Sequence, residues 1–521
     1  MSYQGGRFGY QEKADQTRAA YTGRGRKGYN PNWKKGPTIV RGSEYKPISN
    51  PSSQQSAIFA HIQDSSAHLV VQALAGTGKT STSVECMTKY MREGASILYV
   101  IFANRNAREA EGKCSAKIEV RTCHAFGLNI LKRAYGKVEV DGKGEKARAI
   151  AQALLGPEDE KIELRYNFCK AMSLAKSYLC ETVEQVQEAC DKHDIEPCTL
   201  TEEEFCSNVL KGLETSAQQY MRVDFDDMLW LVVKKNLSVP TFDYVVADEC
   251  QDLSPVRLEI VLRAIKPITG KLLAIGDSHQ AIFGFTGADE KALDTLRERT
   301  SAEVLPLSMT YRCGKAIVEY AQAWVPEYEA AEQNADGEVC EKTVEGMLKS
   351  YEQGGAGPGD FVISRVNAPL VSLCLQFVKQ GRKANVMGKD LGKNLSYMVK
   401  RSNAASVDGF LDWLGTWENV ECERLAKRNK PTEHITDKAD TLRVFCEGEH
   451  DLANVRKRIE DMFSDDEDKG SIRLGTAHKS KGLETDRTWL LTKTFKCQGS
   501  QEDNVMYVAS TRCRNSLYLV G

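Results

Sequence analysis

The sequence lacks several features that would assign it to a particular class of protein. No run of about 18 apolar residues occurs in its 521 residues, so we expect no membrane span and no membrane partner. The opening residues, MSYQGGRFGYQEKADQ, lack the apolar core of a secretory signal. None of the 16 cysteines forms a C-x-x-C pair, which predicts reduced thiols rather than disulfides or a zinc site. These absences predict a cytoplasmic protein.

An excess of charge of one sign is also lacking, but the charges are unevenly distributed. Lys+Arg number 70 and Asp+Glu 72, a net −2. Residues 1–47 carry ten Lys/Arg and three acids, a net +7, so the remaining chain carries −9. This arm interleaves its basic residues with aromatic ones, has no hydrophobic periodicity, and is predicted to be disordered or loosely docked. Its basic and aromatic residues suit phosphates and bases, and a solubilising tail is the alternative.

From residue 48 onward, short apolar strands alternate with charged helical stretches, a pattern typical of parallel sheets covered on both faces. The predicted strands form two sets: His68–Gln72, Ile97–Ala103, Phe242–Ala247 and Leu272–Gly276, then Phe361–Ser364, Ile472–Gly475, Arg487–Thr492 and Ser516–Val520. Helix-rich insertions interrupt the sets at residues 127–230 and 393–468. We therefore predict an α/β fold with a first domain at 48–126 and 231–300, and a second at 301–392 and 469–521.

The segment HLVVQALAGTGKT, His68–Thr80, runs from an apolar strand through a glycine-rich turn into a predicted helix. Glycines let successive backbone N–H groups surround phosphates, and the helix N-terminus adds positive potential. Lys79 would reach the β- and γ-phosphates, and the Thr80 hydroxyl would hold Mg²⁺. Ala73 stands where the strict motif has glycine. A glycine-rich turn at an unrelated strand–helix junction is therefore the alternative.

A second apolar strand, Phe242–Ala247, ends in two carboxylates, Asp248 and Glu249. Asp248 suits a Mg²⁺ ligand, and Glu249 suits a base that positions and activates the attacking water. An acidic strand end is by itself most often a solvated loop. Because the phosphate-binding motif lies about 170 residues upstream, the catalytic interpretation is favoured.

The chain resembles superfamily 1 DNA helicases of the UvrD/Rep/PcrA type over nearly all of residues 50–521. The matching segments follow the family's order: Gln54, Ala75–Thr80, Phe102–Arg108, Arg121–Phe126, Val223–Leu229, Asp248–Asp252, Gly276–Ala288, Tyr311–Arg312, Arg365–Asn367, Thr476–Glu484 and Tyr507–Arg512. This resemblance implies two RecA-like P-loop domains with parallel sheets, each carrying a helical insertion. Phe283 and Thr286 depart from the family's usual Tyr and Arg.

The resemblance also implies roles in binding and hydrolysing ATP. The nucleotide would be bound by Gln54, Ala75, Gly76, Thr77, Gly78, Lys79, Thr80, Ser81, Tyr311 and Glu484, with Tyr311 stacked on adenine and Glu484 near the ribose. Hydrolysis would use Lys79, Asp248, Glu249, Gln280, Arg312 and Arg512, and Mg²⁺ would bind Thr80 and Asp248. Because both arginines come from the second domain, they would reach the phosphate only when the cleft closes. For either arginine alone, a surface salt bridge is the alternative.

The DNA track implied by the resemblance crosses both domains. Its residues would be Phe102, Asn104, Thr122, His124, Phe283, Phe285, Arg365, Asn367, Thr476 and His478. A base–aromatic stack is worth about 1–3 kcal/mol, and melting one base-pair step costs about 1.4 kcal/mol. Static stacking therefore cannot drive unwinding, and gripping must alternate with ATP-gated closure. Core packing is the alternative for each phenylalanine.

These inferences predict an ATP-dependent DNA helicase that moves along single-stranded DNA, with 3′→5′ polarity implied by the resemblance of His478–Glu484. A translocase that displaces proteins without unwinding is a rival, and a non-catalytic recruitment factor is a third hypothesis. Expected partners are single-stranded DNA and forked or tailed duplexes, with replication or recombination proteins bound through the arm. We expect the protein at the nucleoid, or in host cytoplasm if a phage encodes it. Replication, recombination and repair helicases share these motifs, so the sequence does not indicate the pathway.

Overall fold

The structure is a computed structural model that describes residues 41–101, 104–158, 161–193, 195–282, 291–427, 432–463, 470–495 and 499–521, without the side chains of residues 104–106, 390 and 500. Most of the basic arm lies outside the described residues, as do Phe102, Phe283, Phe285 and the side chain of Asn104. No helix in the described part is both long and apolar enough to cross a membrane. The fifteen cysteines in that part are free thiols, and most are buried.

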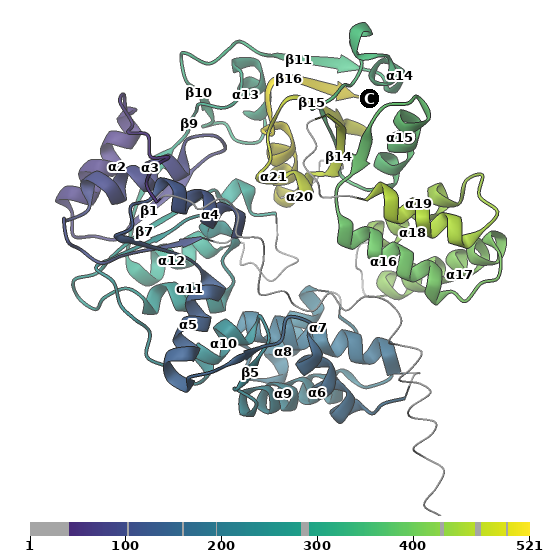
Figure 1. The fold of residues 1–521 in the computed structure, drawn as a ribbon, viewed down its shortest axis with the longest axis horizontal. Coiled ribbons are helices and arrows are strands. Elements are labelled where there is room, and N and C mark those ends of the chain that lie inside the picture. Colours follow the sequence, from purple (N-terminus) through teal and green to yellow (C-terminus); the bar gives the residue numbers. More distant parts are fainter. Residues whose placement is uncertain are drawn as a thin grey trace, which may run out of the picture.

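The first sheet has six parallel strands in the order β3-β2-β6-β7-β1-β8 (Figure 1). Their bounds are β1 Leu69–Ala73, β2 Ile97–Ile101, β3 Ile118–Thr122, β6 Tyr244–Ala247, β7 Lys271–Gly276 and β8 Glu303–Leu307. The four predicted strands of the first set are all present. β8 pairs with β1 at the sheet edge, so the first sheet extends to Leu307, past the boundary predicted at residue 300.

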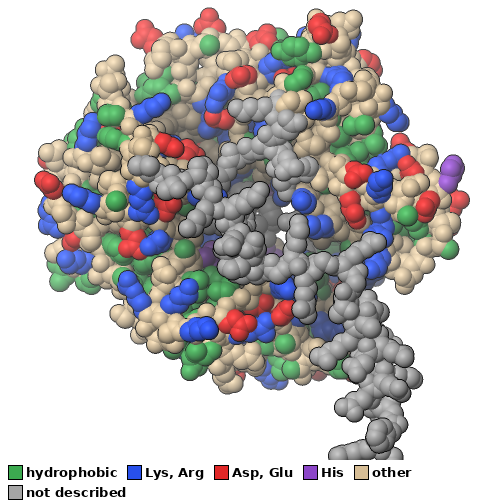
Figure 2. Space-filling model, viewed as in Figure 1, with side chains coloured by type: hydrophobic (Ala, Val, Ile, Leu, Met, Phe, Trp, Pro, Cys, Tyr) green, Lys and Arg blue, Asp and Glu red, His purple; other side chains and the backbone are tan. Residues whose placement is uncertain are grey.

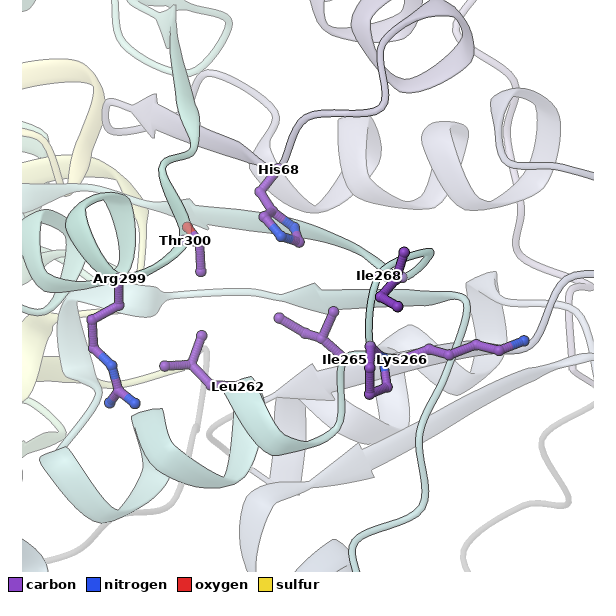
Figure 3. A pocket seen from close by; sticks show the side chains of 9 residues that line it. His68, Leu262, Ile265, Lys266, Ile268, Arg299 and Thr300 are labelled. Carbon is purple, nitrogen blue, oxygen red and sulfur yellow. The ribbon is translucent and has the colours of Figure 1, made fainter.

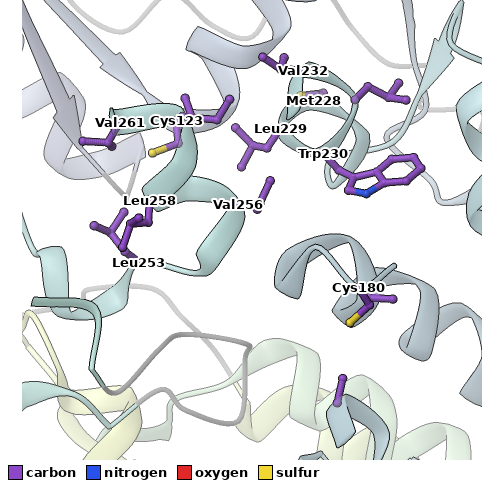
Figure 4. Close-up of a cluster of buried hydrophobic side chains, with 14 of the residues drawn as sticks. Cys123, Cys180, Met228, Leu229, Trp230, Val232, Leu253, Val256, Leu258 and Val261 are labelled. Carbon is purple, nitrogen blue, oxygen red and sulfur yellow. The ribbon is translucent and has the colours of Figure 1, made fainter. Parts of the chain in front are cut away.

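Alternating side chains of the strands face two separate hydrophobic layers. Leu69 and Val71 pack against one set of helices, whereas Val70 packs against the other. The first set is α2 Ser53–Asp64, α3 Lys79–Glu85 with its continuation η1 Cys86–Tyr90, and α4 Asn104–Lys113. The second set is α5 Cys123–Tyr135, α10 Asp227–Lys234, α11 Pro255–Arg263 and α12 Ala292–Thr300. Figure 4 shows part of the second layer, where apolar residues of α5, α10 and α11 converge.

A helical region follows α5 and shares this second layer. It consists of β4 Glu139–Val140, α6 Glu145–Leu155, α7 Ile162–Tyr178, α8 Val183–Lys192, α9 Glu202–Gln218 and β5 Arg222–Val223. Two buried lysines tie it to the chain that returns to the sheet. Lys146 Nζ lies 2.6 Å from Asp227 Oδ2, and Lys176 Nζ lies 2.8 Å from both Asp224 Oδ2 and Asp227 Oδ1. The acidic motif at residues 223–229 is therefore used inside the structure to pair buried cations.

The second sheet is also parallel, in the order β11-β16-β15-β12-β14-β13. Its strands are β11 Glu338–Lys342, β12 Phe361–Ser364, β13 Ala384–Val386, β14 Ile472–Thr476, β15 Thr485–Leu491 and β16 Cys513–Val520. Its helices are α13 Lys315–Ala321, α14 Val344–Leu348, α15 Ala368–Lys379, α20 Ala477–Ser480 and α21 Ser500–Ser510. All four predicted strands of the second set are present. The two sheets confirm the predicted α/β class with parallel sheets.

The described residues between β13 and β14 form four helices: α16 Lys389–Arg401, α17 Val407–Ala426, α18 Glu433–Cys446 and α19 Leu452–Met462. Figure 1 shows these helices at the right and the helices α6–α9 at the bottom, with the two sheets at the left and top. Arg401 Nη2 of α16 lies 3.3 Å from Glu163 Oε2 of α7, and Arg424 of α17 pairs with Glu196. The two helical regions therefore touch.

The two sheet-containing halves meet across a shared core. The connection from β8 passes through β9 Met309–Thr310, which pairs with β10 Glu329–Ala330. Leu74 and Ala75 follow β1 and pack into an apolar cluster formed mainly by the second half, including Tyr328 and Tyr507. The carboxyl end of β1 is therefore covered by the second half, and the cleft between the halves begins at this point.

Candidate nucleotide site

The glycine-rich turn between β1 and α3 has the conformation that its sequence predicts. Gly76 and Gly78 have φ values of +71° and +82°, which favour glycine. A Cβ on Gly76 would lie 2.5 Å from Arg312 Cβ, so the close approach of the second half also requires glycine here. Ala73, which departs from the strict motif, is the last residue of β1 and is fully buried. A glycine is not needed at that position because the chain is still an extended strand.

Lys79 and Thr80 begin α3 at the floor of a cavity of about 890 Å³. Lys79 Nζ donates to the carbonyl oxygens of Ala73 and Leu74, at 3.1 and 3.2 Å. The ammonium group is thus folded against its own loop at the wall of the cavity. Gly76, Thr77, Gly78 and Ser81 line the same cavity, so the predicted phosphate-binding residues are brought together.

The acidic pair follows β6 and faces α3. Asp248 Oδ2 accepts hydrogen bonds from the Tyr99 hydroxyl at 2.8 Å and from Thr80 Oγ1 at 3.3 Å. Burial and the neighbouring charge of Glu249 raise the pKa of Asp248 to about 6. A divalent cation beside this carboxylate would relieve both effects. Because Thr80 and Asp248 offer hard oxygen ligands 3.3 Å apart, these residues fit Mg²⁺, which would neutralise phosphate charge there.

Glu249 is held in an unusual backbone conformation, with a φ of +50°. Such left-handed non-glycine residues persist where the surroundings impose them, often at functional sites. Its Oε2 accepts a 2.6 Å hydrogen bond from Gln251 Nε2. Burial favours a raised pKa for Glu249, but the charges of Lys79 and Lys481 outweigh it and hold the pKa below its usual range. Glu249 is therefore ionised at neutral pH and able to accept a proton from water.

Polar groups of the second half form the opposite wall of the cavity. Arg512 is buried, donates from Nε to the Val508 carbonyl at 2.9 Å, and has Nη2 3.5 Å from Gln280 Oε1. Burial and the nearby charge of Arg312 lower the pKa of Arg512 to about 10, so it stays charged at neutral pH. Lys481 donates to the Gln280 carbonyl at 2.7 Å. Two cations of the second half therefore contact the Gln280 segment of the first half.

Arg312, Tyr311 and Glu484 also line the cavity. Arg312 Nε lies 2.6 Å from Glu484 Oε2, and Arg514 pairs with the same carboxylate. Tyr311 is 40% exposed, as a ring available for stacking would be. Gln54 does not line the cavity: its amide bonds the Ser308 hydroxyl at 2.8 Å and accepts from the Ser308 N–H at 2.9 Å. It lies beside the segment that leads to Tyr311.

Comparison with known proteins agrees with this geometry. Residues 52–301 match the family described as UvrD/REP helicase N-terminal domain. The chain is 24% identical to F-box DNA helicase protein 1 of Schizosaccharomyces pombe over 87% of its own length and 55% of the relative's. It is 22% identical to F-box DNA helicase 1 of Gallus gallus, over 89% of this chain and 48% of that protein.

A third relative is the ATP-dependent DNA helicase PcrA of Staphylococcus aureus, 24% identical over 49% of this chain and 37% of the relative. The chain spans about half the length of the F-box helicases it matches, and about a third of PcrA. The resemblance inferred from the ordered motifs is confirmed by these matches.

Outside the cavity, two of the predicted DNA-track residues, Thr122 and His124, lie at the end of β3. Thr122 is the N-cap of α5, and its hydroxyl accepts from the Ala125 N–H at 3.2 Å. Burial and Arg257 lower the pKa of His124 to about 4. The ring of Phe225, 56% exposed, lies edge-on to His124 at 6.2 Å. Phe225 is thus an exposed aromatic beside the predicted track, and its place within the acidic motif gave the only sequence signal for it.

In the second half, two of the predicted track residues are engaged by protein carboxylates. Arg365 makes a bidentate contact with Glu502, with distances of 2.7–3.1 Å. Asn367 donates from its N–H and its amide to Asp437 of α18. Thr476 caps α20, and burial with Arg365 lowers the pKa of His478 to about 4. Arg365 and Asn367 therefore brace the second half internally, and any contact with DNA would compete with these partners.

A separate cavity of about 390 Å³ opens at the amino edge of the first sheet and shares no lining residue with the cavity described above. Figure 3 shows side chains that line it. His68, Lys266, Ile268 and Arg299 line it, with Ile268 fully exposed at a φ of +69°. His68 Nδ1 accepts from the Leu272 N–H at 3.0 Å. Lys266 and Arg299 pair with Asp243 and Glu259. Among the predicted site residues that the structure describes, none lines this cavity.

Proposed function

We propose that this chain is an ATP-dependent DNA helicase that moves along single-stranded DNA and separates duplex strands. The observation that carries the proposal is a single cavity with complementary walls. The first half supplies the phosphate loop and Glu249, and the second half supplies Arg312 and Arg512. Its volume, about 890 Å³, suits a nucleotide-sized ligand.

The division of groups between two walls supports conditional hydrolysis. Lys79 would pair with the β- and γ-phosphates, and Glu249 would take a proton from the attacking water. Arg512 would stabilise charge that develops on the phosphate oxygens, and it can do so only while the second half covers the cavity. Mg²⁺ held by Thr80 and Asp248 would supply charge neutralisation. Opening and closing of the cleft would then alternate with hydrolysis.

The same opening and closing would move the DNA track. Thr122 with His124 and Thr476 with His478 lie at the carboxyl ends of β3 and β14, the edge where ligands of parallel sheets bind. One pair belongs to each half, so a change in the cleft would change the distance between them. Movement along single-stranded DNA follows if the two pairs grip alternately. The 3′→5′ direction remains part of the proposal and rests on the resemblance of His478–Glu484.

ATP hydrolysis measured with no nucleic acid, single-stranded DNA, duplex DNA and single-stranded RNA tests the proposal. We expect strong stimulation by single-stranded DNA and its loss in Lys79→Ala. Full stimulation by RNA alone would contradict the choice of DNA. The same assay on a variant without residues 1–47 measures what the basic arm adds.

Tailed duplexes test unwinding and direction. A 3′-tailed duplex should be separated and a 5′-tailed one should not, in an ATP-dependent manner. Stimulated hydrolysis without separation of either substrate would favour the protein-displacing translocase. Separation of the 5′-tailed duplex alone would overturn the direction. A Lys79→Ala protein with full biological activity would favour the non-catalytic recruitment factor.

A further inference from the structure

Two buried tyrosines of the second half hold one residue of the phosphate-binding loop. The Tyr507 hydroxyl accepts a hydrogen bond from the Ala75 N–H at 2.8 Å. The Tyr328 hydroxyl donates to the Ala75 carbonyl at 2.9 Å. The two rings meet edge to face, 5.6 Å apart at 84°. Both backbone polar groups of Ala75 are therefore satisfied by side chains from across the cleft.

Tyr507 makes a second contact that Tyr328 does not. Its hydroxyl lies 3.5 Å from Asp277 Oδ2 and can donate to it. A phenol hydroxyl can accept and donate at the same time, so the Tyr507 hydroxyl can bond the Ala75 N–H and the Asp277 carboxylate together. Burial raises the pKa of Tyr507 well above its usual range, which keeps that proton in place at neutral pH. Tyr328 instead approaches Cys313 Sγ, at 3.4 Å.

From Asp277 the hydrogen bonds continue to the acidic pair. The Asp277 N–H donates to Gln251 Oε1 at 2.9 Å, and Gln251 Nε2 donates to Glu249 Oε2 at 2.6 Å. Asp277 Oδ2 also accepts from Gln280 Nε2 at 2.7 Å. Asp277 and Gln251 are both buried, so water does not compete for these bonds. One polar chain thus joins the phosphate loop, Tyr507 and the Glu249 carboxylate.

We propose that Tyr507 is a positioning residue for ATP hydrolysis, which sets the phosphate loop and Glu249 together when the second half covers the cleft. When the halves separate, the Ala75 N–H and the Asp277 carboxylate each lose the Tyr507 hydroxyl as a hydrogen-bond partner. The geometry needed for hydrolysis is therefore stable only in the covered state. This inference rests on the proposed function. Besides the arginines, Tyr507 would then make hydrolysis depend on closure, and it would do so through Glu249.

Tyr507→Phe keeps the ring and removes the hydroxyl. We expect kcat for DNA-stimulated hydrolysis to fall about tenfold, with the KM for ATP changed less than threefold, since Glu249 is misplaced while the binding residues remain. Tyr328→Phe is the matched control, because it removes a bond to the same loop residue without the path to Glu249. Its kcat should change less than threefold. Equal effects of the two substitutions, or a Tyr507→Phe defect confined to KM, would overturn the inference.

A double-mutant cycle tests the chain itself. Gln251→Asn withdraws the amide from Glu249 and should lower kcat about tenfold, again with KM unchanged. If Tyr507 acts through Gln251, the double variant should be no slower than the slower single variant. Multiplied defects would show that the two residues act separately and would overturn the inference. Should Tyr507→Phe fail to fold, judged by its melting temperature, an unchanged kcat in Gln251→Asn alone would overturn it.

The wild-type protein separates this inference from the proposed function. If it shows no hydrolysis that Lys79→Ala removes, the proposed function fails and the inference fails with it. If the wild type hydrolyses ATP and Tyr507→Phe does so at the same rate, only the inference fails.

Discussion

The two halves place the same short pattern, threonine followed two positions later by histidine, at the end of one parallel strand each. Thr122 ends β3 and precedes His124, and Thr476 ends β14 and precedes His478. Both histidines are held neutral by burial, with pKa values of about 4. Both threonines are N-caps, but only the Thr122 side chain makes a capping hydrogen bond.

The residues of the predicted nucleotide site, in contrast, differ between the two halves. The phosphate loop and the acidic pair occur in the first half, whereas the second half contributes buried Arg512 and paired Arg312. The shared pattern therefore coincides with the predicted DNA track, and the unshared residues are those predicted to hydrolyse ATP. Substitutions that affect one set should leave the other unaffected.

The largest expected effect is at Arg512, which the second half contributes to the cavity. Arg512→Ala should lower kcat about 10³-fold, because arginines that stabilise the transferring phosphate are worth 10³–10⁵ in rate. Single-turnover hydrolysis with saturating single-stranded DNA measures it. Arg297→Ala, an exposed arginine on α12, is the control and should keep the wild-type rate. A decrease of less than tenfold in folded Arg512→Ala would place the arginine outside the reaction.

Glu249→Gln should give the next largest effect, a kcat roughly 10²-fold lower, since general-base catalysis contributes about 10²–10⁴. ATP binding should persist because Lys79 and the loop are unchanged. Equilibrium binding of a fluorescent ATP analogue, set beside kcat, separates the two. If kcat and binding weaken equally, Glu249 serves binding rather than proton transfer.

Local sequence predicted the strands that carry the site but not every strand of the sheets. Phe361–Ser364 was predicted with the observed bounds, because a buried parallel strand is a continuous apolar run. β8 was not predicted as a strand. It contains Pro306 and exposed Val304, which are tolerated because β8 is an edge strand. Edge position is a property of the whole sheet and leaves little signal in the sequence.

In the candidate site, too, local sequence predicted some residues but not their long-range contacts. Lys79 and Thr80 were predictable because they begin the helix that follows the glycine-rich turn after β1. Asp248 and Glu249 were predictable because they directly follow β6. The partners of Arg365 and Asn367 were not, because Glu502 and Asp437 are distant in sequence. The contacts of Tyr507 likewise join residues 432 and 230 positions apart. Such pairings depend on tertiary packing.

Acid should destabilise both halves through their histidines. The pKa of each is about 4, against 6.5 in an unfolded chain, so the unfolded state binds more protons between these values. Stability is therefore fully present above pH 6.5 and falls as pH drops towards 4, by up to about 3 kcal/mol per histidine. Melting temperatures from pH 7 to 5 measure the loss.

His124→Gln and His478→Gln should each reduce that loss by a similar amount. The groups facing the rings differ, however: Arg257 and Phe225 around His124, and Arg365, Glu502 and Lys481 around His478. A pH dependence that only one substitution reduces would show that these surroundings, rather than burial, set the protonation of that ring.

The smallest expected effect separates the two threonines. Thr122→Ala removes the hydroxyl that accepts from the Ala125 N–H, and loss of such a cap costs about 1 kcal/mol. Hydrogen exchange at the start of α5 should then be about fivefold faster, and Thr122→Ser should restore it. Thr476→Ala removes no capping bond, so exchange at α20 should change less than twofold. If Thr476→Ala nevertheless weakens binding of single-stranded DNA, the Thr476 hydroxyl contacts the nucleic acid. If hydrogen exchange becomes equally faster at α5 and α20, the two threonines cap their helices equally and the predicted difference between them is wrong.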